Sequence, residues 1–250
     1  MQTQIPTFKK AFIELLRADL TTQWRNRKSV LISSLMVPAI ILFTFKELAE
    51  KLGGAFVIST SIGMGLIGIG LMGYSNSIAR DRDKDVFQRL RVAPIPSSFI
   101  MVSRILVQLI MIFILVTFTF VGGYYFDQIT LSPIGYLFGG IMAIIGGALY
   151  LGLGQALVGL IKNGDTVNST SRLVYIVFIM VGMFGDTGSF GPDFTKTIKF
   201  SPYGSVKCIL SSGLDPTKWN NDSTIALIVT LIYTIIFAAI GIKWFKWNSR

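Results

Sequence analysis

Long apolar stretches alternate with short polar ones along this chain. Most of the apolar stretches hold roughly 17–27 residues, enough for an α-helix to cross the ~30 Å hydrocarbon core of a bilayer. The polar stretches between them are short, as expected for loops at a membrane surface. The pattern predicts an all-α membrane protein with one domain over residues 1–250 and six spans, at 29–45, 55–79, 103–124, 135–161, 173–190 and 224–242.

The fifth apolar stretch is the least regular of the six. Its apolar part, 173–185, would rise only about 20 Å as a helix, which is too short to cross a bilayer. Polar residues 186–192 follow it, and polar residues 162–172 precede it as an expected loop. We therefore expect the chain to enter the membrane and break, and then to re-enter or to run along the surface through 194–208 before the last span.

The first residues predict a helix of a different kind. Over 5–28, large apolar residues recur at three- and four-residue spacing, and most charged residues fall elsewhere around the helix. Such an amphipathic helix lies in the membrane surface. The alternative is that its apolar face packs on a partner protein. Trp24 and the basic residues of 25–28 mark the point where the chain turns into the bilayer.

Composition supports the membrane class and indicates an orientation. Hydrophobic residues make up 52% of the chain and charged residues 14%, far below the roughly one quarter that is typical of soluble domains. The net charge of +10 comes from Lys and Arg that gather mainly near the two ends of the chain and in 80–96. By the positive-inside rule, these segments and both termini are cytoplasmic. Orientation and anionic lipids explain the basic residues, so we predict no nucleic-acid partner.

The longest charged run, 80–96, reads RDRDKDVFQRLRVAPIP and separates the second span from the third. Charged side chains are costly in lipid, so this loop must stand in water. Residues 84–92 can form a short helix that ends before Pro94 and Pro96. Such a helix offers a surface to a soluble partner. The alternative is a solvated basic loop that has no partner.

Several kinds of chemistry are missing from the sequence. It has no histidine, the commonest general base and metal ligand. Its single cysteine, Cys208, allows no disulfide within the chain. There is no GxxxxGK[ST] loop for ATP, no HExxH motif and no TVGYG filter. We expect a transport subunit that is not an enzyme, that binds no metal or cofactor of its own, and that draws energy from another protein.

The loop 80–96 also resembles a known sequence pattern. It is similar to Glu-Arg-Glu-x-Gly-Thr-Leu-Glu-x-Leu followed by a proline, with Asp81 and Asp83 in place of the first two glutamates. Asp85-Val86 departs from the Gly-Thr of that pattern. A second patch, Phe-Ser-Pro-Tyr at 200–203, is similar to the step that precedes a last span. With the order of spans, these patches resemble the permease subunit of an ABC type-2 exporter.

The resemblance implies a larger complex in a bacterial plasma membrane. Two such chains, identical or paralogous, would form the pathway, and two separate ATPase subunits would hold ATP and Mg²⁺. The loop would place a coupling helix in the ATPase, with Phe87 and Leu90 as buried anchors. The alternative for these two residues is packing on their own bundle. The coupling residues that the resemblance implies are Asp81, Asp83, Lys84, Asp85, Phe87, Arg89 and Leu90.

The resemblance also implies a substrate route between the two chains. The expected cargo is an amphipathic peptide, an antibiotic or a lipid-like molecule, because Met and Phe surfaces repack around varied ligands. The candidate lining residues are Ser33, Met36, Ser61, Met64, Asn76, Met180, Met183 and Phe184, each of which has the alternative of being an ordinary packing or lipid-facing residue. The competing function is a stand-alone membrane channel or scaffold that is not coupled to ATP.

Overall fold

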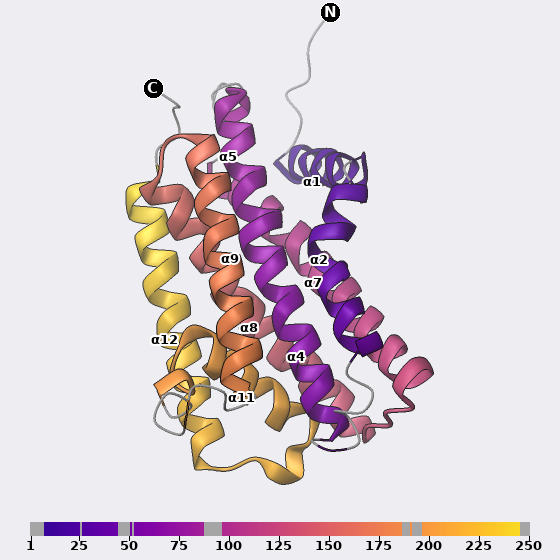
Figure 1. The fold of residues 1–250 in the computed structure, drawn as a ribbon. Coiled ribbons are helices and arrows are strands. Elements are labelled where there is room, and N and C mark those ends of the chain that lie inside the picture. The colour runs from indigo at the N-terminus through magenta and orange to yellow at the C-terminus, as the bar shows by residue number, and fades with distance from the viewer. Residues whose placement is uncertain are drawn as a thin grey trace, which may run out of the picture.

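The computed structural model describes residues 8–25, 27–44, 51, 53–87, 97–186, 191 and 197–245, and within these ranges the chain is helical without a β-strand (Figure 1). In chain order, the helices are α1 (Phe8–Arg25), α2 (Arg27–Thr44), α4 (Gly54–Ile67), η1 (Gly68–Ser75), α5 (Asn76–Asp83), α7 (Ser97–Asp127), α8 (Pro133–Leu160), α9 (Gly164–Asp186), α11 (Pro202–Leu214), η2 (Pro216–Lys218) and α12 (Asn221–Trp244).

Four of the described helices are long and apolar enough to cross a membrane. They coincide with the predicted second, third, fourth and sixth spans. The first of them runs through α4, η1 and α5 without a break, and the others lie in α7, α8 and α12. In α2 the apolar part is the shorter Ser34–Thr44. The prediction of an all-helical protein with long apolar helices is confirmed, and the total of six spans stays a prediction.

The structure corrects the prediction around the fifth apolar stretch. Residues 164–172 are not a loop, because α9 begins at Gly164 and continues to Asp186. The side-chain oxygen of Asn163 accepts a hydrogen bond from the backbone N–H of Thr166 (3.0 Å) and so caps the start of this helix. With 23 residues, α9 is about 35 Å long. It is therefore not the short half-helix that its apolar residues alone indicated.

The helix of the second predicted span is also longer than expected. It continues to Asp83, so 80–83 form the last turn of α5 and not a loop. A turn at 84–85 follows, and 86–87 are helical again. The rest of the predicted coupling helix, 88–92, lies outside the described residues. Charged residues extend the helix beyond its apolar part because their side chains find partners on neighbouring helices, as described below.

Close packing around α8 holds the bundle together. This helix contacts α11, α12 and η1, a segment with the wide turns of a π-helix. Two backbones meet where both carry glycine: a Cβ added to Gly154 would lie 2.4 Å from the carbonyl oxygen of Gly70. Small residues allow such close approach of membrane helices. The short α11 also packs inside the bundle, against α4, α8 and α12.

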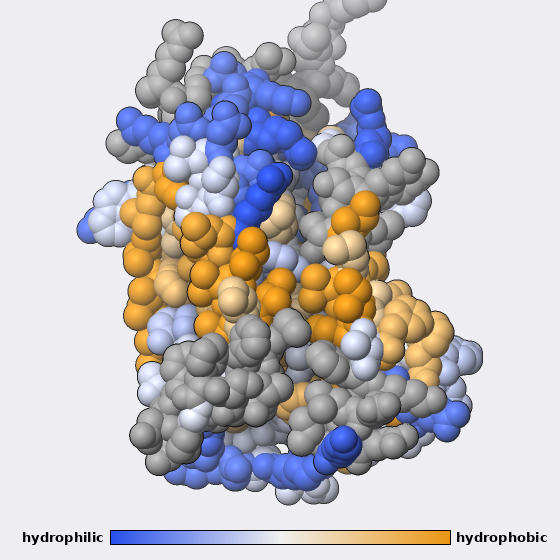
Figure 2. Space-filling model, in the orientation of Figure 1, coloured by the Kyte–Doolittle hydropathy of each residue, from blue (hydrophilic) through white to orange (hydrophobic). Residues whose placement is uncertain are grey.

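The surface shows an apolar belt between two polar ends (Figure 2). In the orientation of Figure 1, α1 lies crosswise at the top, beside the end of α5 and above the start of α2. The turn between α8 and α9 and the last residues of α12 lie at the same end. We call this the upper end of the molecule. The lower end holds α11 and the connection from α11 to α12.

Candidate functional site

Three buried charged side chains from different helices meet at the upper end. Arg104 of α7 forms an ion pair through Nη1 with Asp81 Oδ2 of α5 (2.7 Å) and through Nη2 with Asp19 Oδ1 of α1 (3.3 Å). The Ser103 hydroxyl donates a hydrogen bond to Asp19 Oδ2 (2.6 Å). Each of the three charged residues is less than a tenth exposed. We call Asp19, Asp81 and Arg104 the ion cluster. It connects α1, α5 and α7 at one point.

Burial dominates the electrostatics of Asp19. It raises the pKa of the Asp19 carboxyl above its ordinary value, whereas the charge of Arg104 and the hydrogen bond from Ser103 lower this pKa, and Asp81 raises it further. Removing a carboxylate from water is costly even when a cation stands nearby. Each charge of the ion cluster therefore needs its oppositely charged partner. Loss of one member leaves another charge buried without a partner.

The next residue along α5 joins it to the end of α8. The guanidinium of Arg82 donates one hydrogen bond from Nη1 to the carbonyl oxygen of Val158 (2.9 Å) and one from Nη2 to that of Ile161 (2.8 Å). Carbonyl groups at a helix C-terminus lack partners within the helix and carry partial negative charge. Arg82 is 1% exposed, so these two bonds satisfy carbonyl groups that water cannot easily reach.

Asp83 completes the contact of α5 with its neighbours. Its carboxylate lies against Gly164 at the first turn of α9, so closely that an added Cβ on Gly164 would lie 1.8 Å from Oδ2. A carboxylate is favoured at a helix N-terminus, where backbone N–H groups carry partial positive charge. The end of α5 thus presents a cation to the C-terminus of α8 and an anion to the N-terminus of α9.

The turn after α5 is the most accessible part of this region. Asp83, Lys84 and Asp85 are exposed, and Asp85 adopts a positive φ of 53°. Phe87 is fully buried and meets the ring of Phe245 edge to face, with ring centroids 5.9 Å apart. The structure therefore has Phe87 packed on its own chain, which is the alternative that the sequence left open. Arg89 and Leu90 lie outside the described residues.

A polar cavity of about 480 Å³ opens between α5 and α9 at the same end. Gln23 of α1 also lines it. The charged residues that line it carry both signs: Arg80, Lys84 and Arg172 are basic, and Asp83 and Asp165 are acidic. Asn76 of α5 also lines it. A cavity with this lining is wettable and suits a polar or zwitterionic group.

The charged residues of the upper end pair with one another or with helix ends. Among the described residues, no group of three or more His, Cys, Asp or Glu side chains is placed to hold a metal ion. What the upper end offers is a mechanical arrangement, in which α1, α5, α7, α8 and α9 are connected by charged contacts near an exposed turn.

Sequence comparison decides the family. Residues 10–205 match the profile of the family described as "ABC-2 type transporter". The chain belongs to the ABC-2 transporter family. It is also similar to a Bacillus subtilis (strain 168) protein described as "Putative transport permease YvfS", with 22% identity over 230 residues that cover 88% of this chain and 91% of that protein. The chain is thus a multi-pass membrane protein and a translocation subunit, of a family that normally works with an ATP-binding partner and supplies transport without being the ATPase itself.

The structure separates the candidate lining residues of this ABC-2 chain. Ser61 and Met64 are fully buried in α4, and the Ser61 hydroxyl donates to the carbonyl oxygen of Pro38 in α2 (3.1 Å). Met36 and Met180 are about half exposed on the outer surface of the chain. Asn76 lines the polar cavity. The side chains of Ser33, Met183 and Phe184 lie outside the described part of the structure. A pathway role for any of these residues stays a prediction.

Sequence reasoning missed most of the contacts at the upper end. It assigned Asp81 to a partner protein and did not single out Asp19, Arg82 or Arg104. A signal was present in Arg104, because a charged residue at the start of a predicted apolar span needs a partner. The identity of that partner was not readable, since Asp19 and Asp81 lie 85 and 23 residues away in sequence.

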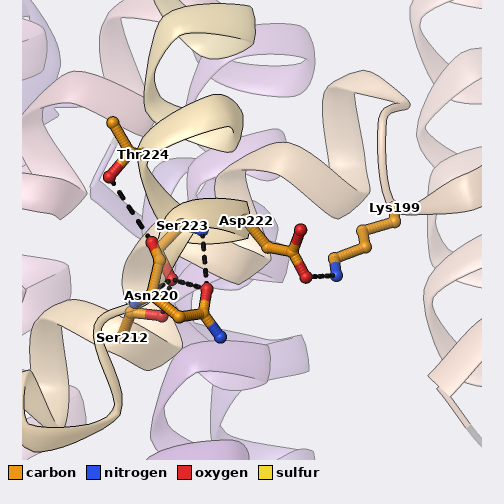
Figure 3. A network of polar contacts seen from close by, with 6 residues as sticks. All are labelled: Lys199, Ser212, Asn220, Asp222, Ser223 and Thr224. Carbon is orange, nitrogen blue, oxygen red and sulfur yellow. Dashed lines mark hydrogen bonds and ion pairs between the residues drawn. The ribbon is translucent and has the colours of Figure 1, made fainter.

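The lower end is held by a different polar network (Figure 3). Asn220 and Ser223 form a capping box at the start of α12, and the Ser223 hydroxyl also contacts that of Ser212 in α11 (2.7 Å). Asp222 forms an ion pair with Lys199. These contacts fix the short α11 against α12. They stabilise the fold at the lower end, in contrast with the exposed charged turn at the upper end.

Proposed function

We propose that this chain is the permease subunit of an ATP-driven exporter, in which two permease chains form the pathway and each binds a separate ATPase at the upper end. The observation that carries the proposal is the exposed charged turn at 83–85, in a chain of the ABC-2 family, directly connected to a buried ion cluster. In this view the upper end is cytoplasmic, the chain crosses the membrane six times, and both termini are inside the cell.

The contacts of α5 support a route for force through the subunit. A partner that moves the turn at 83–85 also moves Asp81 and Arg82, which lie within one turn of helix. Asp81 would transmit the displacement to α7 and α1 through Arg104, and Arg82 to the end of α8. Buried ion pairs and hydrogen bonds resist separation, because breaking them leaves a charge buried without its partner. The ATPase would thus act on several spans through one contact.

The nature of the cargo is inferred from the polar cavity at the upper end and from the apolar belt of the surface below that end. The cavity between α5 and α9 has both signs of charge, and the surfaces below it are apolar (Figure 2). This combination suits an amphipathic molecule with a polar or zwitterionic head, such as a peptide, an antibiotic or a lipid-like compound. The competing function, a channel or scaffold without an ATPase, requires no partner at the exposed turn.

The test is co-purification with a P-loop ATPase expressed from the neighbouring reading frame. In one variant, Lys84→Glu and Asp85→Asn change the charge of the exposed turn, and Asn tolerates the positive φ of position 85. The matched control, Lys218→Glu with Asp215→Asn, makes the same two substitutions at the lower end, where the pair is 2.9 Å apart. We expect the first variant to lose ATPase binding and the control to retain it. Equal binding by both variants would refute docking at this turn.

A further inference from the structure

An apolar pocket of about 230 Å³ lies between α7, α8 and α12. It shares no lining residue with the polar cavity of the proposed transport site. Its wall includes Ile105, Leu109, Ala148, Leu151, Ala238 and Ile242. Ile105 and Ile242 are 41% and 73% exposed, so the pocket opens on the outer apolar surface of the bundle. In a membrane protein this surface meets lipid acyl chains.

The base of the pocket is polar. Tyr74 of η1 donates a hydrogen bond from its hydroxyl to Gln155 Oε1 of α8 (2.8 Å), and both residues line the pocket. Gln155 is only 9% exposed. Among the described residues, its amide nitrogen has no hydrogen-bond partner. An amide N–H₂ group beside apolar side chains is stabilised by any ligand that brings an acceptor to it. The pocket therefore offers a hydrogen-bond donor at the base of an otherwise apolar surface.

The depth of this donor indicates what accepts the bond. Gln155 packs against Gly241 of α12, where an added Cβ would lie 2.5 Å from Gln155 Cγ. Lys243 and Trp244 follow within about 5 Å along the helix axis. Lys and Trp at the end of an apolar helix are typical of the headgroup level of a membrane. The amide thus lies just below the headgroups, where the glycerol ester carbonyls of phospholipids are found, and not at the bilayer centre.

We propose that this pocket binds one acyl chain of a membrane phospholipid, whose ester carbonyl accepts a hydrogen bond from the Gln155 amide. The chain occupies the apolar wall formed by α7, α8 and α12. Lys243 stands at the level of the lipid phosphate and favours an anionic headgroup. The proposal depends on the chain lying in a membrane and not on coupling to an ATPase, so it can fail or succeed independently of the proposed export function.

Photolabelling tests where the acyl chain lies. The full-length chain is reconstituted in nanodiscs of phosphatidylglycerol with a diazirine in the upper acyl chain, and labelled peptides are mapped by mass spectrometry. We expect labelling concentrated on 101–109 and 144–151. Ala148→Phe, which fills the pocket, should reduce labelling there to the level of the remaining surface. The control Ala239→Phe places the same side chain at an exposed neighbouring position of α12 and should leave the labelling unchanged. Equal labelling in both variants would overturn the site.

Lipid chemistry tests the hydrogen bond. Ester-linked and ether-linked phosphatidylglycerol differ in the carbonyl group, and they compete for the labelled site. We expect the wild-type chain to prefer the ester lipid by roughly threefold to tenfold, the worth of one net hydrogen bond. The double variant Tyr74→Phe with Gln155→Leu removes the amide without leaving the tyrosine hydroxyl unpaired, and its preference should fall to about onefold. A wild-type chain without preference, or a variant that keeps it, would overturn the assigned contact.

Discussion

Replacing Arg104 by methionine is the most direct test of the ion cluster. The change keeps a long apolar stem at position 104 but leaves Asp19 and Asp81 buried without their cation. Both carboxylates are 7% exposed, so water cannot take the place of the guanidinium. Removing one partner from a buried ion pair costs about 3–5 kcal/mol. This is a large part of the total stability of an ordinary folded protein, which is about 5–15 kcal/mol.

The measurement is thermal unfolding of the purified chain in a fixed detergent or nanodisc. At roughly 2–4 °C for each kcal/mol in a chain of this size, we expect Arg104→Met to lower Tm by about 6–20 °C. The triple variant, Arg104→Met with Asp19→Asn and Asp81→Asn, removes all three charges and should recover most of the loss. The recovery follows because a neutral set of this shape has no buried charge to compensate.

A matched control comes from the other end of the molecule. Lys199 and Asp222 also form an ion pair, but their side chains are 40% and 49% exposed (Figure 3). Lys199→Met should therefore cost no more than about 1 kcal/mol. If Arg104→Met is no more damaging than Lys199→Met, or if the triple variant is as unstable as the single one, the ion cluster does not hold α1, α5 and α7 together.

Two further predictions concern single contacts. The pKa of Asp19 is raised above its ordinary value of 3.8 by burial, so the folded chain keeps this proton at pH values where the unfolded chain has lost it. The stability that protonated Asp19 contributes is complete below the pKa of the unfolded chain and is lost as pH rises through the pKa of the folded chain. The Tm of the wild type, measured relative to that of Asp19→Asn, should therefore fall as pH rises from about 4. A Tm difference that stays constant or rises contradicts this prediction. Asn220→Ala should lower stability by about 1 kcal/mol in denaturant or thermal unfolding, because α12 loses its capping oxygen and Ser223 loses a partner; a variant as stable as the wild type shows that the capping box contributes nothing.

The sequence was sufficient for much of the fold because one physical demand dominates it. A helix in lipid must be apolar over a fixed length, so spans such as 103–124 and 224–242 are readable from hydropathy alone. The same rule misled the reading of α9. The first turns of α9 are mostly polar, so the pattern predicts a loop there. The cap from Asn163, the contact of Asp83 with Gly164 and the burial of Val167 favour a helix instead.

The candidate site was less predictable because its partners are distant in sequence. Charged residues in 80–96 were expected to face a partner protein, and a linear pattern does not distinguish an exposed charge from one that is paired inside the fold. Arg82 shows this well. In the sequence it lies between Asp81 and Asp83, in a charged run that a linear pattern assigns to the surface. In the structure it is 1% exposed and donates hydrogen bonds to the carbonyl oxygens of Val158 and Ile161.

The wide π-turns of η1 affect how side chains are oriented around the axis of the long helix. Because a π-turn holds more residues than an α-turn, shifting it along the helix by one position rotates each residue it passes by about 100°. Tyr74 lies inside this segment, and Asp81 and Arg82 lie beyond it. Moving the π-turns would therefore reorient the residues that they pass, such as Tyr74, while the α-helical parts of Gly54–Asp83 on either side keep their orientation.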